Sequence, residues 1–247
     1  MIRIRGLRKV FPPDKIALDR VDLDIAAGEF VMVIGQSGAG KTTLLRCLNR
    51  LVEPTAGDVH LNGSAVTGAS PEGLRSVRRQ IGIIFQQFNL VKRASVLENV
   101  LAGRLGHAPG YRTLLGRFPR KDRDVALACL RQVGLEELAS RRADTLSGGE
   151  QQRVAIARAL AQDPKVILAD EPTASLDPKL TESIMGILQR INVERRLTLV
   201  VSQHMLETAL TYGTRIVGLR QGGVIFDGPP NAITLDIVED IYQGGVQ

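Results

Sequence analysis

The stretch VMVIGQSGAGKTTLLRCL, residues 31–48, constrains the fold more than any other part of this sequence. From Gly35 to Thr42 it matches the pattern G-x-x-x-x-G-K-[ST], with an apolar strand-like run before it and a helical pattern after it, which is the context this pattern requires. The glycines let successive backbone N–H groups face a phosphate, while Lys41 adds positive charge and the Thr42 hydroxyl suits Mg²⁺. The stretch predicts a phosphate-binding loop. The alternative, a Gly-rich turn that binds nothing, is less favoured because of the flanking elements.

Two carboxylates support this prediction. In KVILADE, Asp170 and Glu171 come directly after a short apolar run. A carboxylate at the carboxyl end of a buried strand lies in the crevice where open α/β sheets bind ligands. Asp170 is placed to hold a metal ion through water, and Glu171 to orient an attacking water as general base. The alternative for such a pair alone is a solvated strand end. Together with the phosphate loop, the pair predicts a nucleoside triphosphatase.

The order of apolar runs and helical patterns predicts the fold class. The predicted strands are 21–25, 30–34, 81–85, 166–170, 198–202 and 215–219, and the predicted helices are 41–51, 96–103, 122–133, 149–161, 180–195 and 235–242. Their alternation indicates an α/β fold with a mainly parallel sheet. IRIRGL, VDLDI and DVHLNGSAV predict a small antiparallel layer before it. Residues 88–160 interrupt the alternation and predict an inserted helical subdomain, and the turn-rich stretch 220–230 ends the sheet.

Composition limits the classes of protein further. A chain of 247 residues, 44% hydrophobic and 23% charged, is typical of one soluble domain. We expect a cytosolic location, because no apolar run reaches the roughly 18–20 residues of a membrane span and the N-terminus lacks a secretion-type core. Cys47 and Cys129 are expected to be reduced, buried thiols.

The net charge is +6, and the basic residues, mostly arginine, cluster at 75–79, 116–123 and 140–144. They allow three interpretations: nucleic acid, the anionic inner leaflet of a membrane, or a solvated surface. The solvated surface is the default, because acidic residues are interspersed and aromatic residues make up only 4% of the chain.

A second glycine pair precedes another helical pattern, in TLSGGEQQRVAIARAL, residues 145–160. Free N–H groups and the helix dipole make such a start a potential anion site. A second site of this kind must serve the same nucleotide, another ligand, or another copy of the protein.

LSGGEQQRVAIARAL resembles the signature of ABC-type ATPases, and the family's other elements occur in order. They are the phosphate loop at 35–42, Gln86 in IIFQ, ILADE at 167–171, SLD at 175–177 and His204 in VVSQH. The resemblance implies an α/β P-loop NTPase fold of the ABC type, with an N-terminal antiparallel β layer and an inserted α-helical subdomain. The implied nucleotide-binding core is 1–87 and 161–228, the helical signature subdomain is 88–160, and a short helical tail is 229–247.

The same resemblance implies that two copies pair head to tail around ATP and Mg²⁺. It assigns nucleotide binding to Phe11, Gly35, Gln36, Ser37, Gly38, Ala39, Gly40, Lys41, Thr42 and Thr43, to Ser147, Gly148 and Gly149 of the other copy, and to Asp177 at the dimer contact. It assigns catalysis to Glu171, His204 and Gln86, and metal binding to Thr42, Gln86 and Asp170. Each glycine site would then be half of a composite site, and the isolated chain would be a poor enzyme.

Several positions depart from the common family pattern or match no motif. Glu150 stands where the signature usually has Gln, and Met205 follows His204 where many members have Asp. Phe11 stands where Tyr is frequent, but stacking on adenine needs only the ring; the alternative is a core aromatic. His60 and His107 match no motif and are expected on the surface or in loops.

Residues 82–106 and 111–127 resemble the phosphonate-import ATP-binding subunits in particular. This implies an ATP-hydrolysing subunit for uptake of phosphonate or a related phosphorus oxyanion. It would be a homodimer docked on permease subunits at the cytoplasmic face of the inner membrane, served indirectly by a solute-binding protein, with no nucleic acid. The alternative is a soluble ABC ATPase acting on DNA or ribosomes, but the chain shows one core and no sustained heptads. A non-hydrolysing sensor is least favoured, because Glu171 is present.

Overall fold

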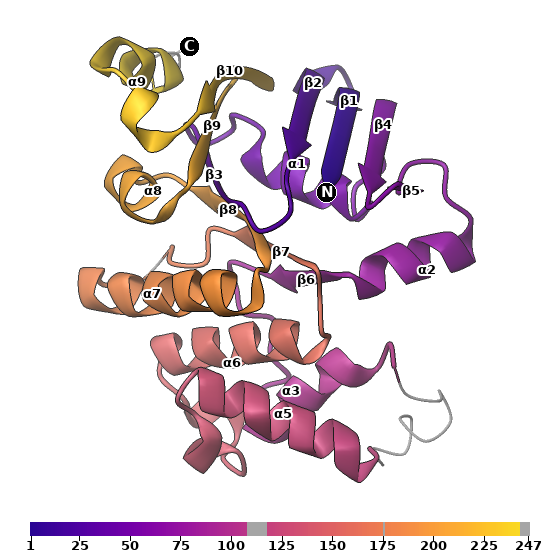
Figure 1. The fold of residues 1–247 in the computed structure, drawn as a ribbon, viewed down its shortest axis with the longest axis vertical. Coiled ribbons are helices and arrows are strands. Elements are labelled where there is room, and N and C mark those ends of the chain that lie inside the picture. Colours follow the sequence, from indigo (N-terminus) through magenta and orange to yellow (C-terminus); the bar gives the residue numbers. More distant parts are fainter. Residues whose placement is uncertain (108–117, 175, 243–247) are drawn as a thin grey trace.

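The computed structural model describes residues 1–107, 118–174 and 176–242, and in them the strands form two sheets (Figure 1). The first is four-stranded and antiparallel, in the order β2-β1-β4-β5: β1 Ile2–Phe11, β2 Lys15–Ile25, β4 Ala56–Leu61 and β5 Ser64–Ala65. The second is six-stranded, in the order β10-β9-β3-β8-β7-β6: β3 Phe30–Ile34, β6 Ile81–Ile84, β7 Val166–Asp170, β8 Thr198–Gln203, β9 Arg215–Arg220 and β10 Gly223–Gly228. Its strands are parallel except β10, which runs antiparallel to β9.

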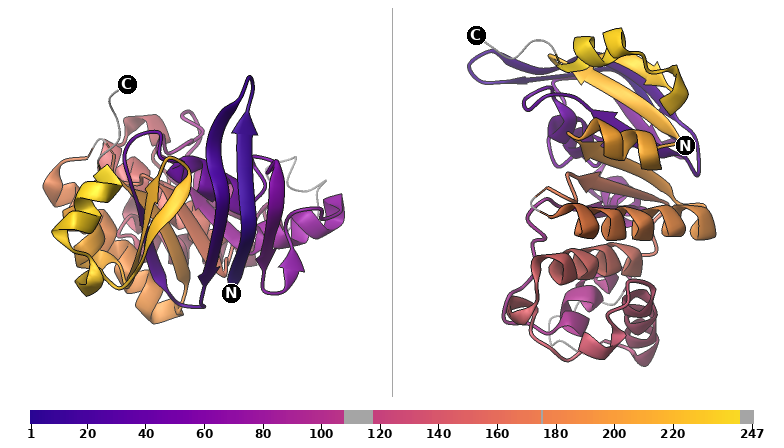
Figure 2. Two further views of the ribbon diagram at one scale, coloured as in Figure 1. Left: turned by 90° about the horizontal axis from the view of Figure 1, so that it is seen from above. Right: turned by 90° about the vertical axis from the view of Figure 1, so that its left-hand side faces the viewer.

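The helices of the described residues divide into groups around these sheets. They are α1 Lys41–Leu48, α2 Pro71–Arg79, α3 Val96–Leu101, α5 Arg120–Gln132, α6 Gly148–Ala161, α7 Pro178–Arg195, α8 Leu206–Tyr212 and α9 Leu235–Tyr242, with short 3₁₀ turns at Ala102–Arg104, Glu136–Leu138, Ala143–Thr145 and Pro230–Ala232. Helices α3, α5 and α6 pack on one another at one end of the molecule, and the antiparallel layer lies at the opposite end (Figures 1 and 2).

The central strand β3 shows why the core has two halves. All of its residues are buried, as expected for a parallel strand covered on both faces. Phe30, Met32 and Ile34 pack in the cluster that includes α6 and α7, whereas Val31 and Val33 pack in the cluster of α1 and the antiparallel layer. Because its side chains alternate between the two faces, β3 packs against both halves of the core. The loop that follows β3 is therefore held between the two halves.

The predicted fold class is confirmed, and so is the antiparallel layer. Several boundaries differ. Helix α1 ends at Leu48, three residues before the predicted end, and the predicted helix 96–103 divides into α3 and a 3₁₀ turn. Residues 220–230, predicted as turns that end the sheet, also hold its edge strand β10.

Two short helices were not predicted. Helix α2 has Ser70 as N-cap and Pro71 at its first position, and this pair is a helix-start signal that could have revealed it. Helix α8 begins without a side-chain cap and has no comparable signal. Among the described residues, no helix is long and apolar enough to cross a membrane.

Candidate functional site

The phosphate loop connects β3 to α1 and leaves the start of α1 open. Gly40 is the N-cap, with φ 107°, and no side chain caps the helix. The glycine is required, because a Cβ atom here would lie 2.4 Å from the carbonyl oxygen of Ala17. The uncapped N–H groups of the first turn are donors suited to an anion.

Lys41 is held inside this loop. Its side chain is only 5% exposed, and its Nζ donates hydrogen bonds to the carbonyl oxygens of Gly35 (2.7 Å) and Gln36 (3.0 Å). Glu171 Oε1 lies 3.7 Å from the same Nζ. Burial lowers the pKa of Lys41, while Glu171 and Asp170 oppose that shift. The hydrogen bonds of the ammonium group therefore go to neutral carbonyl oxygens, and charged phosphate oxygens would be stronger acceptors.

The two predicted carboxylates lie at the end of β7, next to β8. Asp170 Oδ1 accepts hydrogen bonds from Thr42 Oγ1 (2.8 Å) and Ser202 Oγ (2.9 Å). Ser202 Oγ also accepts a hydrogen bond from the backbone N–H of Glu171 (2.9 Å). Glu171 adopts φ 44°, a left-handed conformation that is uncommon for this residue type and frequent at functional sites. Ser202 thus positions both acidic residues.

The donor atoms fit a magnesium ion. The Thr42 hydroxyl, the Asp170 carboxylate and the Gln86 amide all offer oxygen ligands, and Thr42 and Asp170 already contact each other. Among the described residues, no three or more His, Cys, Asp or Glu side chains form a metal-binding cluster. Mg²⁺ is usually held by one or two protein oxygens together with water and substrate phosphates, so a complete protein cage is not expected.

Lys41, Thr42, Gln86 and Glu171 border one cavity of about 470 Å³, whereas Asp170 lies behind Thr42 and is not part of the lining. It is lined by Phe11, Lys15, Ala17, Ser37, Gly38, Gly40, Lys41, Thr42, Thr43, Gln86 and Glu171. Phe11 is half-buried at the end of β1, with Lys9 Nζ 4.8 Å from its ring centroid, so it borders the cavity and is not one of the buried core residues. Gln86 enters from the segment after β6. Phe11 and Gln86 thus border the same cavity as the phosphate loop.

Other predicted residues do not line this cavity. Gly35, Gln36 and Ala39 belong to the loop itself, and the lining also lacks Ser147, Gly148, Gly149, Asp177 and His204. Asp177 is the N-cap of α7, and its Oδ1 accepts the N–H of Leu180 at 2.9 Å. His204 is exposed after β8. Ser175 of the predicted SLD motif lies outside the described residues.

The start of α6 differs from that of α1 because it has a capping box. Ser147 Oγ accepts the N–H of Glu150 (3.4 Å), and Glu150 Oε2 accepts both the N–H and the hydroxyl of Ser147 (2.8 Å each). A Cβ atom on Gly149 would lie 2.9 Å from Leu180 Cδ2, so the end of that leucine side chain would have to shift. On Gly148 it would meet only Leu176 Cδ2 at 3.8 Å, an ordinary contact. Packing within the chain therefore gives no reason for Gly148.

Arg158 was not singled out in the sequence, although it lies in the signature stretch. Its Nη1 donates to the carbonyl oxygen of Asn89 (2.6 Å), and its Nη2 to that of Phe88 (2.7 Å). Phe88 and Asn89 both have positive φ, 54° and 49°, which directs their carbonyl groups to this arginine. Burial lowers the pKa of Arg158. Helix α6 therefore holds the segment that follows Gln86.

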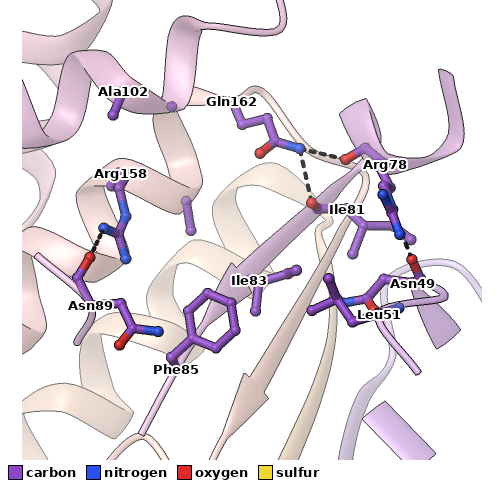
Figure 3. A pocket seen from close by; sticks show the side chains of 12 residues that line it. Asn49, Leu51, Arg78, Ile81, Ile83, Phe85, Asn89, Ala102, Arg158 and Gln162 are labelled. Atoms are coloured by element: carbon purple, nitrogen blue, oxygen red, sulfur yellow. Dashed lines mark hydrogen bonds between the residues drawn. The ribbon is translucent and has the colours of Figure 1, made fainter. Parts of the chain in front are cut away.

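A second cavity, about 350 Å³, lies between the sheet and the helical end of the molecule (Figure 3). Its lining includes Leu51, Ile81, Ile83 and Phe85 on the sheet side and Ala102, Gly103, Arg158 and Gln162 on the helical side. Gln162 Nε2 donates to the carbonyl oxygens of Arg78 (2.6 Å) and Ile81 (2.8 Å), and this joins the two sides at one end of the groove. The groove is mostly apolar and lies directly beside the residues that precede Gln86.

Comparisons with known proteins agree with this geometry. The profile of the ABC transporter family matches residues 18–174. The chain belongs to the ABC transporter family. The phosphonates import ATP-binding protein PhnC 1 of Halalkalibacterium halodurans is 52% identical over 98% of this chain and 94% of its own length. The corresponding protein of Shouchella clausii is 51% identical over 100% of this chain and 93% of its own length.

Solved ABC cassettes share the fold over nearly the whole chain. A dimeric bacterial ABC transporter cassette is 38% identical, with a TM-score of 0.83, over 94% of this chain and 100% of that one. A dimeric post-hydrolysis cassette bound to ADP and phosphate is 37% identical, with a TM-score of 0.82 over the same shares. The predicted ABC-type ATPase is thus confirmed as a family, and nucleotide binding follows from it.

Proposed function

We propose that this ABC cassette is the ATP-hydrolysing subunit of an importer for phosphonate or a related phosphorus oxyanion. The support is the name shared by relatives that are 46–52% identical over nearly the full chain, all of them phosphonates import ATP-binding proteins. None of these relatives is described as a protein of nucleic acid or ribosomes, so we expect no nucleic acid partner. The subunit would work at the cytoplasmic face of the inner membrane.

One observation carries the proposed mechanism: a single chain holds a phosphate cradle with an open side, and a signature that does not line it. In a head-to-tail dimer, Ser147, Gly148 and Gly149 of one copy would close over the γ-phosphate held by Lys41 of the other. Gly148 is then glycine because of a neighbour that the single chain does not contain. Because the signature lies outside the phosphate cradle, we also propose that the chain divides into three parts. These are the core 1–87 and 161–228, the signature subdomain 88–160 and the tail 229–247.

Within that composite site each residue has a separate task. The open start of α1 and Lys41 bind the phosphates, and Phe11 stacks on the adenine. Thr42, Asp170 and Gln86 would hold Mg²⁺, which neutralises charge on the phosphates when bound. Glu171 accepts a proton from the attacking water, and His204 orients the γ-phosphate against it. Asp177 would bridge the two copies.

We assign the apolar groove of Figure 3 to a short segment of the membrane permease. Leu51 in its lining is 49% exposed, and with Ile81, Ile83 and Phe85 it presents a continuous apolar surface to an occupant. Phe85 in the groove directly precedes Gln86, and Arg158 holds the residues just after it. An occupant would therefore contact the chain on both sides of the glutamine that reaches the nucleotide. A solute-binding protein would act on the permease and only indirectly on this chain.

The first test is affinity purification of the tagged chain from detergent-solubilised membranes of its host, with mass spectrometry of what copurifies. A polytopic permease, together with ATPase activity stimulated by a phosphonate-loaded binding protein, supports the import function. Soluble partners or nucleic acid without a permease would reject it and leave only the ATPase.

A second test addresses the composite site. Glu171→Gln should bind ATP and accumulate as a closed dimer, because hydrolysis fails after the two copies have met. Size-exclusion chromatography with light scattering in ATP and Mg²⁺ measures this. Asp163→Asn, a substitution of the same kind after α6, should stay monomeric under these conditions. A monomeric Glu171→Gln that retains bound ATP would contradict the assignment of the base.

A further inference from the structure

The last described helix, α9, reaches two loops of the nucleotide site although it carries none of the family's motifs. The hydroxyl of Tyr242 donates a hydrogen bond to the carbonyl oxygen of His204 at 2.9 Å. The side-chain Nε2 of Gln36, in the phosphate loop, donates to the carbonyl oxygen of the same Tyr242. One residue thus connects the phosphate loop to the histidine assigned to the γ-phosphate.

Helix α9 is firmly held where it makes these contacts. Ile241 is 1% exposed and packs over β9, where a Cβ atom on Gly218 would lie 2.5 Å from Ile241 Cδ1. Arg220 Nη1 donates to the carbonyl oxygen and to Oδ1 of Asp240, both at 3.2 Å. Strand β9 pairs with β3, and Gly218 is the partner of Ile34, the residue before the phosphate loop. Figure 1 shows α9 above α8, against the strand pair β9–β10.

The backbone of His204 is fixed from both sides. Its N–H donates to Gln203 Oε1 at 2.9 Å, and Gln203 Nε2 donates to Thr173 Oγ1 at 3.0 Å, close to the carboxyl end of β7. Its carbonyl group accepts from Tyr242. The imidazole itself is exposed, so the position of the ring depends on how well the backbone beneath it is fixed.

We propose that Tyr242 is a positioning residue for ATP hydrolysis, with its hydroxyl fixing the His204 backbone relative to the phosphate loop so that the imidazole meets the γ-phosphate. This rests on the function proposed for His204. Burial raises the pKa of Tyr242, so the hydroxyl stays protonated and remains a donor across the working pH range. Hydrolysis depends on such fixed geometry more than nucleotide binding does, because the many phosphate contacts of the loop are made without His204.

The test is Tyr242→Phe in the full chain assembled with its permease. We expect kcat for ATP to fall by about 5-fold while KM changes by less than about 2-fold, the size expected for one lost hydrogen bond expressed only in the reaction. Tyr212→Phe is the matched control: Tyr212 is also half-buried, and its hydroxyl lies 3.5 Å from the carbonyl oxygen of Glu182, away from the nucleotide. It should leave both constants unchanged.

A double-mutant cycle separates positioning from a general structural role. In a His204→Ala background, Tyr242→Phe should cause no further loss, because the ring that it positions is gone. An equal loss in both backgrounds, or a lower melting temperature with unchanged kcat, would overturn the proposal. The wild-type complex separates failure of the proposed function from failure of the role of Tyr242. If the wild-type complex lacks ATPase activity, the proposed function itself is wrong.

Discussion

Two helices of this cassette begin with glycine, and their first turns differ in a way that separates their tasks. Helix α1 has Gly40 as its N-cap and no side-chain cap, and it starts with the buried Lys41 at the edge of a cavity. Helix α6 has Ser147 as its N-cap and a complete capping box, and its first turn does not line that cavity. No side chain caps the first-turn N–H groups of α1, whereas in α6 the N–H groups of Ser147 and Glu150 are already bonded within the capping box.

The difference teaches that a glycine-led helix start is not by itself a binding site. A helix start without a side-chain cap can bind a ligand within a single chain, because its N–H groups have no competing partner. A capped start is stable without a ligand and contributes only when something is brought to it. We therefore expect α1 to govern nucleotide affinity in the single chain, and α6 to govern only what happens after two copies meet.

Removing Lys41 should have the largest effect. Lys41→Ala deletes the positive charge inside the loop, so nucleotide binding by the single chain should become undetectable and ATPase activity should fall by more than about 1000-fold. Equilibrium binding of a fluorescent ATP analogue and phosphate release measure the two effects. Lys165→Ala removes an exposed lysine elsewhere and should change neither. Normal nucleotide affinity in Lys41→Ala would contradict the claim that the start of α1, unlike that of α6, governs nucleotide binding by the single chain.

The substitution Gly148→Asp tests the start of helix α6. The single chain should bind ATP within about 2-fold of wild type, because Gly148 is outside the cavity and its added Cβ meets no close neighbour. Dimer ATPase should fall by about 100-fold or more, since a carboxylate would face the γ-phosphate of the partner copy. Gly186→Asp, on α7 with no atom near its added Cβ, is the control.

Mixed dimers sharpen this test further. In a dimer of one Lys41→Ala copy and one Gly148→Asp copy, one composite site carries both defects and the other is intact. About one nucleotide per dimer should then be occluded. No occlusion in such dimers would show that each site is built within one chain, or that both sites must act together.

The sequence predicted the open start well and the capped start only in part. The Gly35–Thr42 spacing and the apolar run before it dictate a local structure, so the loop, Thr42 and the position of Asp170 after β7 could be predicted. Phe11 and Gln86 could be placed only through the resemblance, because their approach to the loop depends on how β1 and β6 pack. Ser202, Arg158 and Tyr242 could not be identified from the sequence. Each acts through a hydrogen bond to a backbone group 31 to 70 residues away, and such a contact leaves no spacing pattern in the sequence.

Arg158 links helix α6 to the segment that follows Gln86, and its removal should have an intermediate effect. Arg158→Met leaves the carbonyl groups of Phe88 and Asn89 without their donor, so Gln86 should be less well placed and dimer ATPase should fall by about 10-fold. Nucleotide affinity of the single chain should stay within about 2-fold. Arg158→Lys should recover little, because an ammonium group cannot donate in two parallel directions. Arg190→Met, an exposed arginine of α7, should have no effect.

The smallest effect should come from Glu150, and the chain contains a matched control for it. Helix α3 has the same capping box: Glu98 Oε2 accepts the N–H (2.7 Å) and the hydroxyl (2.8 Å) of Ser95. In both boxes, hydrogen bonds from the serine lower the pKa of the glutamate below its ordinary 4.5. The stabilisation is therefore complete above pH 4.5 and is lost as the pH falls through the lowered pKa. Glu98→Gln and Glu150→Gln should each lower the melting temperature slightly at neutral pH, and these differences should shrink on acidification.

Only Glu150 should also affect ATP-driven dimerisation. Its carboxylate accepts the hydroxyl hydrogen of Ser147 and adds negative charge to the surface that would meet the γ-phosphate of the partner. In a Glu171→Gln background, where the closed dimer accumulates, Glu150→Gln should therefore strengthen ATP-driven dimerisation by about 2- to 5-fold, the size of a screened surface charge, whereas Glu98→Gln should leave it unchanged. Light scattering across a range of ATP concentrations measures both. Equal changes in the two variants would mean that the start of α6 is a structural cap like that of α3 and does not meet the nucleotide.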